Sequence, residues 1–271
     1  MPNEAVTPQP IEPTRPAIVI TGASSGIGQA LARVAAPDGA FLLLLGRSRN
    51  ALDELAAELA HAGAQSAALA IDLRAPDATD QIERELAARG LYCDVLINSA
   101  GFGVFGPAEA TSRQEHLELI GVNIRALTDL TLRFLPGMIA RRRGGIINLG
   151  SITGYAAGPN MSTYYASKAY VNSFSAALSE ETAGSGVTVT CVEPGVVRTA
   201  FFERCAVGQS RLMKLMPRSS ATHTAEAGWR GFKAGKSLVV PRAINRFAVG
   251  VCRLLPRSLI TKFVGALQQP R

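Results

Sequence analysis

Apolar and polar positions follow two patterns along the chain. Short unbroken apolar runs predict strands buried on both faces, and residues 41–45 (Phe-Leu-Leu-Leu-Leu) are a clear example. Between these runs, apolar residues recur every three or four positions, as on one face of a helix. The expected strands are 17–21, 40–46, 67–71, 94–98, 145–150, 187–193 and 237–240, and the expected helices are 27–36, 49–62, 77–89, 112–140, 161–183 and 224–234. This alternation predicts an α/β domain with a doubly wound parallel sheet of about seven strands and helices on both faces.

The length and the ends of the chain divide it into three parts. The 271 residues suit a single α/β domain, which we place at residues 16–240. Residues 1–15 are rich in proline and lack an apolar core, so we expect a disordered leader. In residues 241–271, apolar residues recur at helical spacing among arginines, and Pro256 divides the stretch. We expect two short helices there, forming a basic amphipathic extension.

Charge is concentrated in that last part. The whole chain carries a net charge of +7, but residues 227–271 hold nine Lys or Arg and no Asp or Glu, which leaves −2 for the rest. We expect the extension to pack on the domain or at a subunit contact, and the alternative is a peripheral contact with an anionic membrane. Nucleic-acid binding is not expected, because the charge lacks a recognition module.

Other classes of site and compartment are disfavoured by composition. No apolar run is long enough to cross a membrane. The four cysteines and three histidines show no metal-like or disulfide-like spacing, so we expect no metal site and a cytoplasmic protein with reduced thiols. These residues are Cys93, Cys191, Cys205, Cys252, His61, His116 and His223.

A glycine-rich turn follows the first expected strand. Residues 21–28 read Thr-Gly-Ala-Ser-Ser-Gly-Ile-Gly and lead into a helix. A strand, a glycine-rich turn and a helix in this order are typical of a dinucleotide-phosphate site in a Rossmann-like fold. Gly22 allows a tight turn, Gly26 lets the backbone approach a pyrophosphate, and Gly28 lets the helix pack on the sheet.

A second group of residues is suited to proton transfer. Tyr164 and Lys168 are four apart and share one helix face, and Ser151 precedes Tyr164 by thirteen residues. An ammonium group nearby lowers the pKa of a tyrosine from its ordinary value of about 10 toward neutrality. Tyr165 is only three residues from Lys168, so we do not expect it to be the acid, and we interpret Tyr155 as a pocket wall.

Together these motifs resemble the short-chain dehydrogenase/reductase family from residue 16 to about residue 200. The match includes Asp72-Leu73, Asn98-Ser99-Ala100-Gly101 with serine in place of the family's second asparagine, Asn123 in Gly-Val-Asn, and Pro194-Gly195 with Thr199 after it. The resemblance implies four catalytic residues, Asn123, Ser151, Tyr164 and Lys168. It implies a cofactor site formed by Thr21, Gly22, Ser24, Ser25, Gly26, Ile27, Gly28, Arg47, Ser48, Asp72, Leu73, Asn98, Ala100, Gly101, Tyr164, Lys168, Pro194, Gly195, Val197 and Thr199.

The end of the second strand indicates which cofactor is preferred. Where an NAD-binding protein usually has an acidic residue, this chain has Arg47 followed by Ser48. A guanidinium suits a 2′-phosphate, so we expect NADP(H) in preference to NAD(H). The alternative is that Arg47 is a solvated residue that stacks on adenine.

The expected function is an NADPH-dependent oxidoreductase that interconverts a carbonyl compound and an alcohol. The carbonyl compound is expected to be a hydrophobic ketone or aldehyde. By resemblance, Tyr164 exchanges the proton, Ser151 positions the oxygen, Lys168 also binds the nicotinamide ribose, and Asn123 interrupts its helix and anchors a water. Alternatives are an NAD-linked hydroxysteroid-type dehydrogenase and a non-catalytic cofactor-binding protein. The resemblance also suggests a homodimer or homotetramer through the helices at 112–140 and 161–183.

The expected substrate is a small hydrophobic molecule. Apolar residues in the segment 196–216 and after Asn98 suit an apolar ligand, although those of the segment serve equally well to pack it onto the domain. They are Phe201, Phe202, Leu212, Met213, Leu215, Met216, Phe102, Val104 and Phe105.

Overall fold

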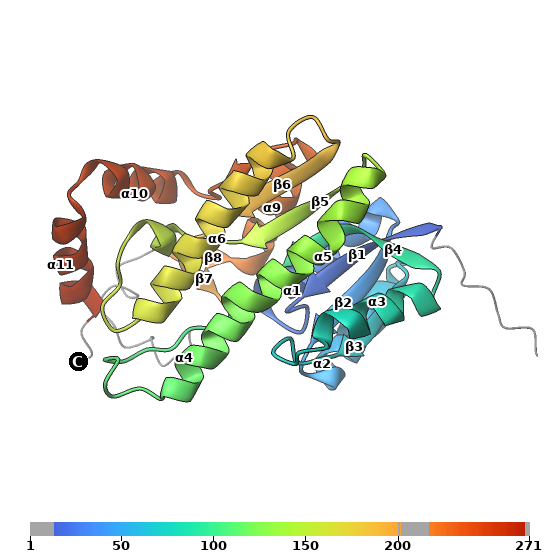
Figure 1. Cartoon of the computed structure of the whole chain (residues 1–271), viewed down its shortest axis with the longest axis horizontal. Helices are drawn as coiled ribbons and strands as arrows, with labels where there is room; N and C mark the ends of the chain where they lie inside the picture. Colours follow the sequence, from blue (N-terminus) through green and yellow to red (C-terminus); the bar gives the residue numbers. More distant parts are fainter. Residues whose placement is uncertain (1–13, 200, 202–216, 269–271) are drawn as a thin grey trace, which may run out of the picture.

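The computed structural model describes residues 14–199, 201 and 217–268. Its centre is a parallel sheet of seven strands in the order β3-β2-β1-β4-β5-β6-β9, which confirms the predicted doubly wound α/β fold (Figure 1). The strands are β1 (Arg15–Thr21), β2 (Phe41–Gly46), β3 (Ser66–Ala70), β4 (Leu91–Asn98), β5 (Gly144–Leu149), β6 (Val187–Val192) and β9 (Leu238–Val239). Nearly all of the expected leader lies outside the described residues.

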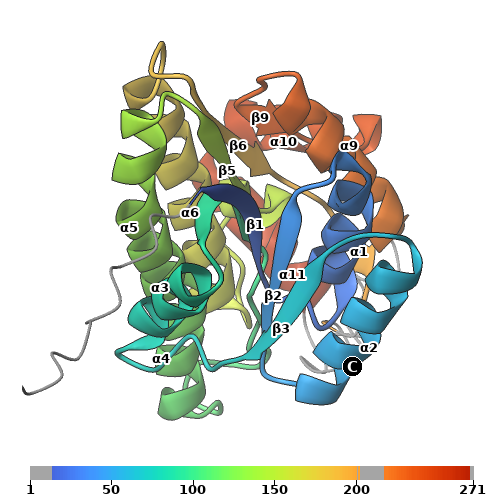
Figure 2. The ribbon, with the colours of Figure 1, turned by 90° about the vertical axis from the view of Figure 1, so that its right-hand side faces the viewer.

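Helices cover both faces of the sheet (Figure 2). One face carries α1 (Gly26–Ala35), α2 (Arg49–His61) and α9 (Ala221–Lys233). The other carries α3 (Ala78–Ala88), α4 (Arg113–Ile120), α5 (Leu127–Ala140) and α6 (Ser162–Glu181). Short helical turns follow α1 and β5, at η1 (Ala36–Asp38) and η3 (Ile152–Tyr155).

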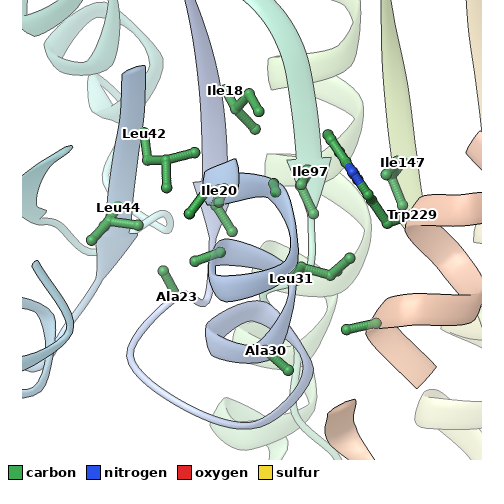
Figure 3. Close-up of a cluster of buried hydrophobic side chains, with 14 of the residues drawn as sticks. Ile18, Ile20, Ala23, Ala30, Leu31, Leu42, Leu44, Ile97, Ile147 and Trp229 are labelled. Carbon is green, nitrogen blue, oxygen red and sulfur yellow. The ribbon is translucent and has the colours of Figure 1, made fainter. Parts of the chain in front are cut away.

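Successive side chains of the central strands enter opposite cores. Ile18 and Ile20 of β1 pack with Leu31 of α1 and Trp229 of α9, as Figure 3 shows. Their neighbour Val19 packs on the other side, in the core that includes residues of α3, α5 and α6. Because side chains alternate along a strand, a strand buried on both faces must be apolar throughout, and this explains the unbroken apolar runs of the sequence.

The structure differs from the sequence prediction in three places. The helix expected at 112–140 is α4 and α5 joined by a π-helical turn, η2 (Gly121–Ala126). A two-stranded sheet, β7 (Val197–Arg198) with β8 (Ser219–Ser220), was not predicted. Helix α9 begins three residues earlier than expected because the Ser220 hydroxyl caps it by accepting a hydrogen bond from the backbone N–H of His223.

The C-terminal extension forms the two helices predicted on either side of Pro256, α10 (Ala243–Leu254) and α11 (Arg257–Gln268). They lie beyond the carboxyl ends of β5 and β6 (Figure 1), and each buries an apolar residue, Val249 of α10 and Ile260 of α11. Arg253 donates a hydrogen bond to the Tyr155 hydroxyl at 3.2 Å, and Gln268 donates to the Tyr165 hydroxyl at 2.7 Å. Among the residues that the structure describes, no helix is both long enough and apolar enough to cross a membrane.

Candidate active site

A cavity of about 560 Å³ opens at the carboxyl ends of the central strands. It is lined by the loops after β1 to β6 and by the first turns of α6. The strand order reverses at β1 and β4, and in open α/β sheets such a reversal creates a crevice for a ligand. Most of the predicted site residues line this cavity: Gly22, Ser24, Ser25, Gly26, Ile27, Arg47, Asp72, Leu73, Ala100, Gly101, Ser151, Tyr164, Lys168, Pro194, Gly195, Val197 and Thr199.

The glycine-rich turn forms one wall of the cavity with its backbone. Gly22 has φ +68° and Gly26 has φ +59°, a region that disfavours residues with a side chain. A Cβ on Gly22 would lie 2.9 Å from the backbone of Ala100, and one on Gly28 would lie 2.4 Å from the carbonyl oxygen of Gly22. The turn is therefore a backbone cradle at the N-terminus of α1, a shape and polarity that fit a cofactor diphosphate.

Four predicted cofactor residues lie behind or beside the cavity wall: Thr21, Gly28, Ser48 and Asn98. The Thr21 hydroxyl accepts hydrogen bonds from the backbone N–H groups of Ser99 and Ala100, each at 3.0 Å, and so ties the β1 and β4 loops together. Asn98 donates to Thr131 at 3.1 Å and to Asn148 at 2.9 Å. Ser48 caps α2 by accepting from the N–H of Ala51. These contacts support the loops, and cofactor contact by these four residues stays a prediction.

Lys168 and Ser151 are both buried at the floor of the cavity. The Lys168 ammonium donates a hydrogen bond to the carbonyl oxygen of Leu149 at 2.6 Å. Burial lowers its pKa to about 8, because the charged form loses hydration. The Ser151 hydroxyl donates to the carbonyl oxygen of Pro194 at 3.3 Å and accepts from the N–H of Thr153 at 3.1 Å. Both polar groups are thus held in fixed positions.

Tyr164 lies beside them, on the same face of α6 as Lys168. The Lys168 nitrogen is 5.8 Å from the centre of the Tyr164 ring, and the Phe201 ring is 5.3 Å from it. The neighbouring Tyr165 is buried and does not line the cavity. Tyr155 does not line the cavity either, so the interpretation of it as a pocket wall is wrong. Its hydroxyl instead donates to the carboxylate of Glu193 at 3.1 Å.

Asn123 lies in the π-helical turn η2 and is almost fully buried. Its side-chain nitrogen donates to the carbonyl oxygen of Phe102 at 3.0 Å and to the Ser167 hydroxyl at 3.1 Å, and its oxygen accepts from the N–H of Phe102 at 3.1 Å. A π-helical turn carries an extra residue, which turns this side chain toward the β4 loop. Asn123 therefore joins three elements behind the catalytic candidates and does not itself line the cavity.

The ends of β2 and β3 bring charged groups to the opposite side of the cavity. Arg47 is exposed there, and Asp72 lies near it. Arg74 donates to Oδ1 of Asp72 at 3.0 Å and to Oδ2 at 2.6 Å, and it also pairs with Glu118. This pairing with Arg74, with a smaller contribution from Arg47, lowers the pKa of the Asp72 carboxyl. The negative charge beside Arg47 is thus largely compensated.

Two charged residues near the site were not predicted from the sequence. Arg74 lines the cavity, and its position two residues after Asp72 was the available signal. Glu193 is buried directly before Pro194, and burial raises its pKa to about 7. An acidic residue at the end of a buried strand was the signal for it. Of the predicted apolar segment 196–216, residue 200 and residues 202–216 lie outside the described residues.

Comparison with known proteins decides the family. The sequence profile of the short chain dehydrogenase family matches residues 16–208. The chain belongs to the short-chain dehydrogenase/reductase family. As a member, it is an oxidoreductase of the class that acts on CH–OH and C=O groups, which confirms the predicted family and enzyme class.

Individual members of the short-chain dehydrogenase/reductase family are similar along most of the chain. A fatty acyl-CoA reductase of Acinetobacter baylyi is 33% identical over 77% of this chain and 70% of its own length. An NADP-dependent 3-hydroxy acid dehydrogenase of Salmonella typhimurium is 35% identical over 66% and 72% of the two chains. A short-chain dehydrogenase from Sphingobium yanoikuyae, solved in complex with NADPH, has a TM-score of 0.76 and 31% identity, and the match covers 90% and 97% of the two chains.

Proposed function

We propose that this protein uses NADP(H) to interconvert a hydrophobic carbonyl compound and its alcohol, with Tyr164 as the general acid and base. One observation carries the proposal: Tyr164, Ser151 and Lys168 come from different parts of the chain and line one cavity beside the glycine cradle. A phenol, a hydroxyl and an ammonium around one space are the groups needed to hold a carbonyl oxygen and to give it a proton.

Proton transfer is the task of the chain's own residues. Lys168 carries a positive charge below its pKa of about 8, and a cation beside a phenol favours the phenolate and lowers the pKa of that phenol. Ser151 holds the substrate oxygen near Tyr164, which gives its proton to that oxygen during reduction. The nicotinamide, when bound, supplies the hydride to the carbonyl carbon. Asn123 keeps the β4 loop and α6 in place, and by family resemblance it anchors a water that links Lys168 to solvent.

The preference for NADP(H) rests on Arg47 at the end of β2. An exposed guanidinium at this position matches a 2′-phosphate, whereas an acidic residue would repel it. The Salmonella relative is NADP-dependent and the Sphingobium relative binds NADPH, and both support the same cofactor here. An NAD-linked dehydrogenase is the alternative, and a comparison of the two cofactors separates them.

A hydrophobic substrate is supported by the remaining lining of the cavity. Phe102, Val104, Phe105 and Phe201 bring apolar side chains to the cavity that Tyr164 lines. Aromatic and aliphatic walls with a few polar groups are typical of sites for apolar ligands. The similarity to a fatty acyl-CoA reductase agrees with a substrate of this class.

We also propose a homodimer or homotetramer in the cytoplasm. Helices α4 and α5 expose several large apolar side chains, which suits a subunit contact. These side chains are Leu117, Ile120, Leu132 and Ile139. A Leu132→Glu variant should sediment as a smaller species than the wild type, and an unchanged sedimentation coefficient would argue against this contact.

The experiment that tests the function is NADPH oxidation with ketones and aldehydes graded by size and polarity, with NADH assayed in parallel. Tyr164→Phe should abolish turnover and leave NADPH affinity nearly unchanged. Tyr165→Phe is the matched control, because it removes the hydroxyl of the adjacent tyrosine outside the cavity and should leave turnover intact. Substantial turnover by Tyr164→Phe would refute the role of Tyr164. Tight NADPH binding without turnover of any carbonyl would favour a non-catalytic cofactor-binding protein.

A further inference from the structure

The outer side of α10 and α11 exposes a group of large apolar side chains, which we name the C-terminal face. Phe247 is 70% exposed, Leu254 is 86% exposed and Phe263 is 66% exposed. The face consists of Ile244, Phe247, Leu254, Leu255, Leu259 and Phe263. Single exposed leucines are common on protein surfaces, but several large apolar residues on two consecutive helices mark a surface that meets another apolar phase.

Helical geometry places these residues opposite the packed side of the extension. Phe247 and Leu254 are seven residues apart and share one side of α10, whereas Val249 on the same helix is buried. On α11, Leu259 and Phe263 are one turn apart and exposed, whereas the adjacent Ile260 is buried. The amphipathic pattern of these helices is therefore satisfied by the domain on one side and left uncovered on the other.

The charge of the extension is of one sign. No acidic residue follows Glu226, and the two helices with their flanking residues carry five basic side chains. These are Arg242, Arg246, Arg253, Arg257 and Lys262. Arg242 and Arg246 donate to the carbonyl oxygens of Arg218 and Val240, which holds both guanidinium groups near the start of α10. The Arg253 guanidinium lies over the Tyr155 ring on the domain side, so Arg257 and Lys262 are the exposed cations beside the apolar residues of α11 that can meet an anionic surface.

We propose that the C-terminal face docks on an anionic phospholipid bilayer. Basic helices with an aromatic and aliphatic side lie in the plane of such a membrane, with the apolar side in the acyl boundary and the cations at the lipid phosphates. A second copy of the chain fits less well, because a two-fold contact through this face would bring like charges together.

The packed side of α11, opposite the C-terminal face, lies next to residues of the candidate active site. Val264 of α11 packs with Met161, Tyr165 and Val196, and this apolar cluster also contacts Tyr164 and Phe201. The docking itself does not depend on the proposed function, since its measurement needs no substrate.

Co-sedimentation of the full chain with vesicles tests the proposal. We expect binding to vesicles of phosphatidylcholine with phosphatidylglycerol, weaker binding at high salt, and little binding to phosphatidylcholine alone. Arg257→Glu/Lys262→Glu should lower the partition coefficient about tenfold or more, because each basic residue near an anionic surface adds to the attraction. The control Arg84→Glu/Lys236→Glu makes the same change in net charge on α3 and before β9, and it should bind like the wild type.

A fluorescent probe identifies the bound surface. Tryptophan in a Phe247→Trp variant should emit as a solvated side chain in buffer and shift to shorter wavelength with anionic vesicles, whereas Trp229 is buried in both states. Failure of the wild type to bind anionic vesicles would overturn the proposal. Binding without a shift at position 247 would overturn it too, because another surface would be the one in contact. A dimer that dissociates in Phe247→Ser, with no vesicle binding, would assign the face to a subunit contact instead.

Discussion

Replacement of the buried Lys168 by methionine should abolish activity and yet stabilise the protein at neutral pH. The structure buries the ammonium group, and this lowers its pKa from 10.5 to about 8. Because each pKa unit corresponds to about 1.4 kcal/mol, holding the charge inside the folded protein costs about 3 kcal/mol. Methionine has a similar length, carries no charge and suits an apolar interior.

Part of this gain is offset by a lost hydrogen bond. In Lys168→Met the carbonyl oxygen of Leu149 loses its donor, which costs about 1–2 kcal/mol in a buried position. The net expectation at pH 7 is a variant about 1–2 kcal/mol more stable than the wild type. The folded pKa lies below the unfolded one, so the unfolded wild type binds more protons between pH 8 and 10.5. The wild type therefore gains stability relative to the variant over that range, and the difference should vanish or reverse near its upper end.

Urea unfolding at pH 7 and near pH 10 measures the difference in free energy of unfolding between Lys168→Met and the wild type. Lys236→Met is the matched control, because Lys236 is exposed and its replacement should give the same small difference at both pH values. The reasoning would be refuted by a Lys168→Met protein less stable than the wild type at pH 7. It would equally fail if the difference were the same at both pH values.

Three further changes test other parts of the site. Arg47→Asp should weaken NADPH binding about tenfold or more and favour NADH, and titration with both cofactors measures this preference. An unchanged cofactor preference would show that Arg47 does not bind the 2′-phosphate. Burial raises the pKa of Glu193 from 4.5 to about 7, so the wild type loses stability as the pH rises through this window. Glu193→Gln should therefore raise the melting temperature more at pH 8 than at pH 4. An equal change in melting temperature at both pH values would contradict the raised pKa of Glu193. Gly28→Ala places a Cβ 2.4 Å from the Gly22 carbonyl oxygen and should lower the free energy of unfolding by about 1–3 kcal/mol. The expected readouts are a lower melting temperature and weaker cofactor binding. An unchanged melting temperature would show that the turn relaxes freely.

The sequence was sufficient for the architecture because its strongest signals are local. Unbroken apolar runs gave the strands of the sheet, and Pro256 marked the break between α10 and α11. The glycine-rich turn and the four-residue spacing of Tyr164 and Lys168 each predicted a group of site residues. The fold brings these two groups to one cavity. These features depend on neighbours in sequence, which a pattern can capture.

The remaining features depend on distant contacts or on small deviations from regular geometry. The π-helical turn at 121–126 adds one residue to a turn, too little to disturb the apolar periodicity of the helix around it. The strands β7 and β8 have two residues each and show no period. The role of Arg74 arises from its ion pair with Glu118 on another element. Tyr155 was misplaced because its hydroxyl forms hydrogen bonds with Glu193 and Arg253, which are distant in sequence.

The hydrogen bond from Gln268 to Tyr165 has a consequence for the order in which the protein matures. It joins positions 103 residues apart, so the helix that carries Tyr164 meets its partner in α11 only after that much more chain has been made. At typical rates of synthesis this delay is roughly 5–20 seconds. The sheet strands up to β6 are complete well before, whereas the side of the candidate active site near α11 closes last. A ribosome stalled before α11 would therefore hold a nascent chain with most of its sheet formed and Tyr165 still exposed.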